Sequence, residues 1–285
     1  MIEVELAKNA GFCFGVKRAM EAVTEQLSQN HCQPIYTFGP LIHNGEVVRE
    51  LENKGVRVVS TLDELRMIPR GIMIIRSHGV SKETYEMMQS AGFLCVDATC
   101  PFVKRIHKIV EKRSIEGEHI IIVGNNGHPE VDGIKGWCAE TPVIIESKEA
   151  AENFTTKTSG KFCIVSQTTF NYNKFKDIVE IIQKKGYDIN VVDTICNATR
   201  ERQEEAEALA LRADVMIVIG DKNSSNTRKL YEICKNKCAM THFIQTLDDL
   251  HLELPKSVRL VGITAGASTP NNIIEEVQNY VRINF

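Results

Sequence analysis

The sequence predicts an α/β protein made of three similar units with mainly parallel sheets. Short apolar segments of strand length alternate with longer amphipathic segments along the whole chain, which is typical of a βα series. One order of cysteine, helix, apolar strand and glycine also occurs three times, which indicates an internal repeat. We therefore expect three units arranged pseudo-three-fold around a central cavity.

The individual elements follow from the apolar pattern. Aliphatic runs bounded by glycine or polar residues predict strands at residues 57–60, 72–76, 119–123, 143–146, 161–166, 215–219 and 259–263. Amphipathic segments predict helices at residues 16–28, 82–91, 103–115, 173–185, 199–212, 227–237 and 270–281. Further apolar strands end at Gly39 and in the Val-Asp pairs that precede Cys100 and Cys196.

Composition excludes several classes of protein. The 285 residues are 43% hydrophobic and 25% charged, which predicts a packed core. A net charge of −3 gives no general attraction to nucleic acid or anionic membranes. The opening MIEVELAKNA does not resemble a signal peptide, and the longest apolar runs are too short to span a bilayer. Nine cysteines without a secretory signal indicate reduced thiols, so we expect a cytoplasmic protein.

The repeat places special residues at equivalent positions. A cysteine stands directly before a helix at Cys13, Cys100 and Cys196. An apolar strand follows at nearly constant spacing and ends at Gly39, Gly124 and Gly220. Four positions after these glycines lie His43, His128 and Ser224. A further strand leads to His78, Thr168 and Ser268. The repeat predicts units at residues 1–97, 98–193 and 194–285.

All of these residues lie at the carboxyl ends of predicted strands, where open parallel sheets bind ligands. Three units around one axis would bring the three thiols together. Helix N-termini there lower a thiol pKa and suit a phosphorylated ligand. Three converging thiolates indicate either zinc or an iron–sulfur cluster, and the spacing does not decide between them. On a four-iron cluster, three thiolates leave one iron available as a Lewis acid.

Nine motifs together resemble the family of 4-hydroxy-3-methylbut-2-enyl diphosphate reductases. They are GFCFGVKRA, GPLIHN, RSHGV, DATCP, GHPEV, SQTT, CNATRERQ, GDKNSSNT and TAGASTP, and they run from Gly11 to Pro270. The resemblance implies a trefoil of three α/β domains. It also implies one [4Fe–4S] cluster per chain, held by Cys13, Cys100 and Cys196, with one open iron.

The same resemblance implies an oxidoreductase of the methylerythritol phosphate pathway. The implied reaction is the reductive dehydroxylation of an allylic diphosphate to isopentenyl and dimethylallyl diphosphate, with an electron donor such as ferredoxin or flavodoxin. Glu130 is the expected proton source, and Thr168 relays or orients the proton. The residues that match the family's diphosphate pocket are His43, His78, His128, Thr168, Ser224, Ser225, Asn226 and Ser268.

Two other functions stay open on the residues alone. One is a zinc hydrolase that uses His43, His128 and Glu130, or the three cysteines, as ligands. The other is a non-catalytic protein that binds phosphorylated metabolites. For the remaining cysteines we expect core packing or loop positions: Cys32, Cys95, Cys138, Cys163, Cys234 and Cys238.

One charged helix face has two interpretations. Lys104, Lys108 and Lys112 recur with the period of a helix, and such a face is usually only solvated. The alternative hypothesis is a docking patch for an acidic electron carrier.

Overall fold

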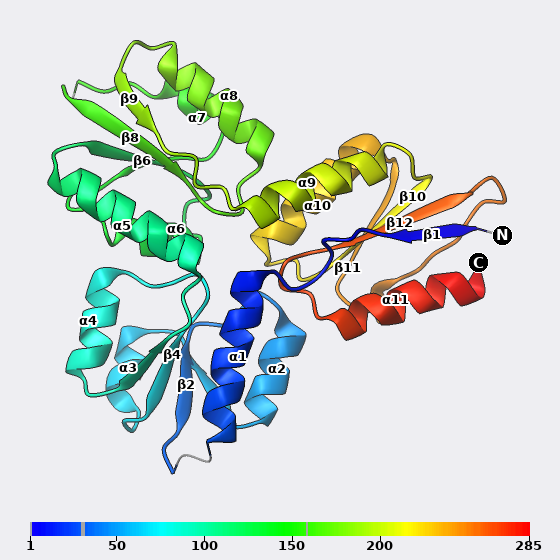
Figure 1. Cartoon of the computed structure of the whole chain (residues 1–285), viewed down its shortest axis with the longest axis horizontal. Coiled ribbons are helices and arrows are strands. Elements are labelled where there is room, and N and C mark those ends of the chain that lie inside the picture. The colour runs from blue at the N-terminus through cyan, green and yellow to red at the C-terminus, as the bar shows by residue number, and fades with distance from the viewer. Residues whose placement is uncertain (1, 30–31, 158) are drawn as a thin grey trace. The chain divides into compact units, whose positions relative to one another are not determined.

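The structure is a computed structural model that describes residues 2–29, 32–157 and 159–285 (Figure 1). The described residues form three four-stranded sheets, and all neighbouring strands in them run parallel. This confirms the predicted α/β class with three similar units.

The first sheet joins the two ends of the chain. Its strand order is β1-β12-β10-β11, with β1 at Glu3–Leu6, β10 at Val215–Ile219, β11 at Met240–Ile244 and β12 at Leu260–Ala265. The helices of this part are α9 (Asn197–Ala210), α10 (Ser225–Lys237) and α11 (Asn271–Asn284), together with a 3-10 turn at Leu247–Asp249. In β1, Glu3 pairs with Leu260, so the first strand lies beside the last one.

Alternate side chains of β10 face opposite layers. Ile217 and Ile219 pack with Val277 of α11, whereas Met216 and Val218 pack with residues of α9 and α10. Helices therefore cover both faces, which explains why this strand reads as a continuous apolar run rather than an alternating one.

The second sheet has the order β3-β2-β4-β5. Its strands are β2 (Ile35–Phe38), β3 (Val56–Val59), β4 (Ile72–Ile75) and β5 (Leu94–Asp97). The helices in this part of the chain are α1 (Phe14–Ser28), α2 (Gly45–Asn53), α3 (Leu62–Met67) and α4 (Lys82–Ser90). Met73 and Ile75 of β4 pack against Leu65 of α3 and Met88 of α4.

The third sheet repeats this order as β7-β6-β8-β9. Its strands are β6 (His119–Val123), β7 (Val143–Ile145), β8 (Lys161–Ser166) and β9 (Asp188–Val191). The helices are α5 (Pro101–Ile115), α6 (Pro129–Lys135), α7 (Lys148–Asn153) and α8 (Tyr172–Gln183). In β6, Ile121 packs on the layer that contains α8, and Ile122 packs on the layer that contains α5 and α6.

The chain divides into two compact units. The first contains the residues up to Val16, His43–Val47 and Cys196–Phe285, and the second contains Lys17–Ile42 and Val48–Ile195. The first sheet belongs to the first unit, and the other two sheets belong to the second. The boundaries 1–97, 98–193 and 194–285 stay a prediction. Among the described residues, no helix combines the length and apolar character that crossing a membrane requires.

Candidate active site

Two aspartates shape the turns that lead into Cys100 and Cys196. Asp97 Oδ1 accepts the backbone N–H of Thr99 at 3.0 Å. Asp193 Oδ1 accepts the N–H of Ile195 at 3.1 Å in the same way. Each carboxylate therefore stabilises an Asx-turn just before a cysteine, a turn in which aspartate is favoured. This explains the repeated Val-Asp-x-x-Cys spacing, whose structural role was not predicted.

Cys100 is held at the start of α5 in the second unit. It occupies the N-cap position, and Pro101 fills the first helical position, where a missing N–H costs nothing. The Cys100 N–H donates to the Ser77 carbonyl at 2.9 Å. Arg18 of α1 donates to the Thr99 carbonyl, also at 2.9 Å. The loop is therefore fixed on both sides of its thiol-bearing residue.

Cys13 and Cys196 lie together in the first unit. The Cys13 N–H donates to the Ala267 carbonyl at 3.2 Å, and Cys196 is the N-cap of α9. Burial raises the pKa of the Cys196 thiol, the polar groups of Thr199 lower it, and the nearby Cys13 thiol raises it again. This influence of one thiol on the other shows that the fold places two of the three predicted ligands near each other.

Glu130 and Thr168 meet at the carboxyl ends of two paired strands in the second unit. Glu130 follows β6 and lies in the first turn of α6, and Thr168 follows β8. The Thr168 N–H donates to Glu130 Oε1 at 2.6 Å, and the Thr168 hydroxyl donates to Oε2 at 2.8 Å. Both oxygens of the carboxylate are therefore oriented by one residue.

Burial gives Glu130 the acidity of a proton donor. The residue is 2% exposed, and this burial raises its pKa to about 7, although the two hydrogen bonds from Thr168 lower it. A carboxyl group with a pKa close to neutral is divided between its two protonation states there, which suits general acid catalysis.

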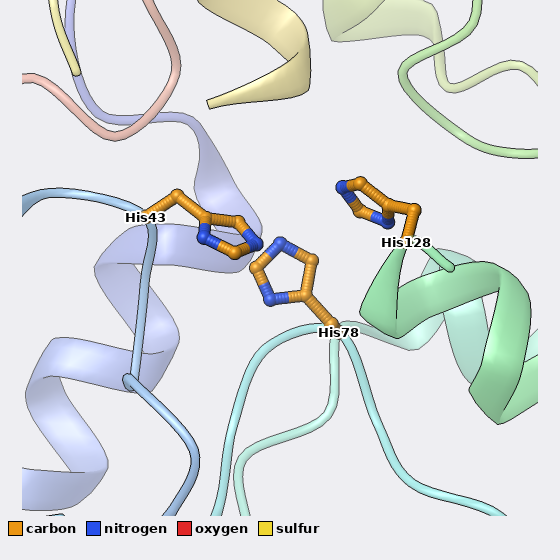
Figure 2. A group of neighbouring side chains, drawn as sticks. All are labelled: His43, His78 and His128. Atoms are coloured by element: carbon orange, nitrogen blue, oxygen red, sulfur yellow. The ribbon is translucent and has the colours of Figure 1, made fainter. Parts of the chain in front are cut away.

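His78 and His128 form a pair in the second unit (Figure 2). Their ring centroids are 5.5 Å apart at an angle of 74°. His128 caps α6, and its Nδ1 accepts the Glu130 N–H at 3.1 Å. The neutral ring therefore carries its proton on Nε2. His78 lies in a turn closed by the Gly79 N–H, which donates to the Arg76 carbonyl at 3.0 Å.

Polar residues of the first unit gather at the start of α10. Ser224 is the N-cap and accepts the Thr227 N–H at 3.3 Å. The Ser268 hydroxyl donates to the His43 carbonyl at 2.9 Å and lies 3.5 Å from the Ser224 hydroxyl. The side-chain oxygen of Asn226 accepts the Ala267 N–H at 3.0 Å. Ser225 follows the cap as the first residue of the helix.

The predicted site residues are therefore divided between the units. His43, Ser224, Ser225, Asn226 and Ser268 belong to the first unit with Cys13 and Cys196, and His78, His128, Glu130 and Thr168 belong to the second with Cys100.

Sequence reasoning missed Asp221, which holds the short segment that contains His43. Its two carboxylate oxygens accept the N–H groups of Gly45 at 2.9 Å and Asn223 at 2.7 Å. The residue follows the strand that ends at Gly220, and it is buried. Its position directly after a strand glycine was the available signal.

The predicted lysine face is partly neutralised. Lys104 Nζ lies 2.5 Å from an oxygen of Asp97, and Lys112 Nζ lies 3.7 Å from an oxygen of Glu116. For Cys163, Cys234 and Cys238 the structure agrees with core packing, because all three are buried.

Comparison with known proteins identifies the family. The profile described as LytB protein matches residues 4–282. The 4-hydroxy-3-methylbut-2-enyl diphosphate reductase of Caldanaerobacter subterraneus subsp. tengcongensis is 46% identical over 276 residues, which cover 97% of this chain and 95% of the relative. The reductase of the same name from Clostridioides difficile is 45% identical over 280 residues, covering 98% and 99%.

A solved structure agrees with these relatives. The structure of the E-1-hydroxy-2-methyl-but-2-enyl-4-diphosphate reductase from Plasmodium falciparum superposes with a TM-score of 0.91 at 29% identity, and the match covers 99% of this chain and 87% of that chain. Profile, relatives and structure span nearly the whole sequence and agree with one another. The chain belongs to the LytB protein family.

Proposed function

We propose that this protein is a 4-hydroxy-3-methylbut-2-enyl diphosphate reductase of the non-mevalonate isoprenoid pathway. The substrate takes up two electrons and two protons, its allylic C–O bond breaks, and water leaves. The products are isopentenyl and dimethylallyl diphosphate. The observation that carries the proposal is the buried Glu130 carboxyl, held by Thr168 with a pKa of about 7, in a chain 46% identical to a reductase of that name.

The thiols fit an iron–sulfur cluster. Cys13 and Cys196 lie close enough for one thiol to shift the pKa of the other, and Cys100 and Cys196 are both N-caps of long helices, where N–H groups stabilise thiolates. We assign these three cysteines as the ligands of a [4Fe–4S] cluster. The cluster would supply the electrons and a Lewis-acidic iron.

The start of α10 fits a diphosphate. The Nδ2 group of Asn226 is buried and has no hydrogen-bond partner among the described residues, while its Oδ1 is fixed by Ala267. The amide therefore presents an oriented donor at the N-terminus of α10, and a helix N-terminus is a favourable place for an anion. Ser225, Ser268 and His43 belong to the same unit. In the proposal, His78 and His128 complete the diphosphate site.

Glu130 and Thr168 fit the proton path. Hydroxide is a poor leaving group, so a proton must reach the departing oxygen. When Glu130 is protonated, its O–H donates to the Thr168 hydroxyl, and that hydroxyl is then able to donate onward. Thr168 thus holds the proton at a defined atom and orients it, and burial of the pair excludes water from the transfer.

The electron donor in this proposal is a small carrier protein such as ferredoxin or flavodoxin. Each turnover consumes two electrons. A cluster held by the three cysteines passes electrons on but has to be reduced again, so an external reductant is required. A compartment that keeps thiols reduced also suits the cluster, and we therefore propose a cytoplasmic reaction.

An anaerobic assay tests the proposal directly. Protein purified without oxygen is incubated with (E)-4-hydroxy-3-methylbut-2-enyl diphosphate and a reduced viologen dye, and products are separated by chromatography. We expect both five-carbon diphosphates. Substitution of Cys13, Cys100 or Cys196 by serine abolishes turnover, whereas Cys32→Ser, which changes an exposed thiol, retains it. A cluster-loaded protein that oxidises the dye without forming either diphosphate contradicts the proposal.

A further inference from the structure

Arg202 is a buried cation in the first unit whose role is not explained by the residues assigned above. It lies on α9, the helix that begins after Cys196, and is 4% exposed. Its Nε donates to the Asn9 carbonyl and its Nη2 donates to the Gly11 carbonyl, both at 2.8 Å. These bonds attach the loop that leads into Cys13 to the helix that carries Cys196.

A second side chain of α9 holds the same loop. Glu205 accepts the N–H groups of Lys8 at 2.6 Å and Asn9 at 2.9 Å. Anchoring of the loop backbone is therefore shared between Glu205 and two of the nitrogens of Arg202. It does not account for the third nitrogen of the guanidinium.

That third nitrogen, Nη1 of Arg202, is buried and has no hydrogen-bond partner among the described residues. A charge-bearing N–H without a partner in a protein interior is costly. Burial lowers the pKa of Arg202, and the acidic groups that raise it most are the thiols of Cys13 and Cys196, ahead of Glu205 and Glu201. The guanidinium therefore lies between the loop that leads into Cys13 and the helix that begins after Cys196, within electrostatic range of both thiols.

We propose that Arg202 is a positioning residue that donates a hydrogen bond from Nη1 to a sulfur of the iron–sulfur group bound by Cys13 and Cys196, and that it raises the reduction potential of that group. The inference rests on the proposed function. Reduction adds one negative charge to a group that three thiolates already make anionic. A fixed positive charge and an N–H donor at sulfur both favour the reduced state.

The test compares reduction potentials in matched variants of the cluster-loaded protein. Arg202→Gln keeps hydrogen-bond donors but removes the charge, and Arg202→Lys keeps the charge. Arg282→Gln removes an exposed arginine near the end of α11 and is the control. Anaerobic titration with dithionite, which supplies one electron per cluster, is followed by electron paramagnetic resonance.

We expect Arg202→Gln to lower the ratio of reduced to oxidised cluster at a given potential at least tenfold, which corresponds to about 59 mV for a one-electron couple. Arg202→Lys should stay closer to the unsubstituted protein, and Arg282→Gln should match it. An unchanged potential in Arg202→Gln overturns the inference and leaves Arg202 as a loop anchor only.

A second measurement does not depend on how the variants fold. The unsubstituted protein is labelled with ¹⁵N-arginine, its cluster is reduced, and pulsed electron paramagnetic resonance is used to detect coupling between the cluster and an arginine nitrogen. Coupling is expected, and Arg202→Lys should remove it. If no coupling is found in a protein that holds the cluster and turns over substrate, this inference is wrong and the proposed function still stands. If protein purified without oxygen contains no iron, the proposed function is contradicted as well.

Discussion

The hydroxyl of Ser268 donates a hydrogen bond to the carbonyl of His43 at 2.9 Å, across 225 positions of sequence. The backbone N–H of Gly45 donates a hydrogen bond to the carboxylate of Asp221 in the same unit. The chain thus leaves the second unit for the five residues His43–Val47, packs them into the first, and returns. His43 therefore belongs to the unit that holds the start of α10, although the residues up to Ile42 and from Val48 onward belong to the other unit.

Loss of the Asp221 carboxylate should weaken substrate binding. Asp221→Ala leaves the N–H groups of Gly45 and Asn223 without their acceptor, which costs on the order of 1–3 kcal/mol and loosens the His43 segment. We expect KM to rise about tenfold or more with a smaller change in kcat. Asp248→Ala, which removes another acid of the first unit, is the control. Equal KM values in both variants would show that Asp221 does not contribute to substrate binding.

Glu130→Gln should slow turnover far more than it weakens binding. The amide keeps the size of the side chain but has no acidic proton, so we expect kcat to fall by about 10²–10⁴, the usual contribution of general acid catalysis. The dissociation constant of the substrate should change by less than about tenfold, as measured by isothermal titration under anaerobic conditions. Unchanged kcat removes Glu130 from the proton path.

Thr168→Val tests the relay separately from the acid. Valine has the shape of threonine but lacks the hydroxyl that donates to Glu130 at 2.8 Å, and the backbone bond at 2.6 Å remains. We expect a fall in kcat of at least about tenfold, with Thr168→Ser close to the unsubstituted enzyme. A serine variant as slow as the valine variant would show that packing, rather than the hydroxyl, is needed.

The pKa of Glu130 predicts how stability depends on pH. Its folded-state value of about 7 lies above the ordinary value of 4.5, so the neutral acid is the form that favours folding. This contribution is fully present below pH 4.5 and is lost as the pH rises through 7. Relative to Glu130→Gln, the protein should lose about 3 kcal/mol of unfolding free energy between about pH 4 and pH 8. Urea titrations of both metal-free proteins measure this, and a constant difference contradicts the raised pKa.

Gly79 should not tolerate a side chain. Its φ is +72°, and a Cβ atom would lie 2.7 Å from His107 Cε1 and 3.0 Å from Thr99 Cγ2. Gly79→Ala therefore combines backbone strain with a clash beside His78 and should destabilise the protein by about 2–4 kcal/mol. Gly186→Ala has the same kind of strain at φ +80° with open space around the Cβ and should cost about 1 kcal/mol. Equal losses in thermal or urea unfolding would show that the clash is relieved elsewhere.

The regular elements were readable from the sequence because buried parallel strands and their crossover helices have strong periodicities. The segments 119–123, 161–166 and 215–219 coincide with β6, β8 and β10. Elements with weak patterns were missed. In β11, Met240–Ile244, a threonine and a histidine interrupt the apolar run, and α3 and α7 are six residues long, too short to show helical periodicity.

From the sequence, the site could be predicted only as a set of residues that follow the carboxyl ends of strands. The repeat selected Cys13, Cys100 and Cys196 because each precedes a helix, but spacing carries no information about which contacts hold the loops. Asp221 and Arg202 bind backbone groups 176 and 193 positions away. Such long-range partners leave no local pattern. The position of Asp221 after a strand glycine marks it only as a strand-end residue, and Arg202 has no comparable signal.

The most direct test of the account is the iron and sulfide content of anaerobically purified protein and of its Cys13→Ser, Cys100→Ser and Cys196→Ser variants. One cluster held by these three thiols predicts about four irons and four sulfides per chain. Most of this content should be lost in each of the three variants and kept in Cys32→Ser. Protein that turns over the substrate without iron, or that keeps its full iron after loss of any one of the three thiols, would contradict it.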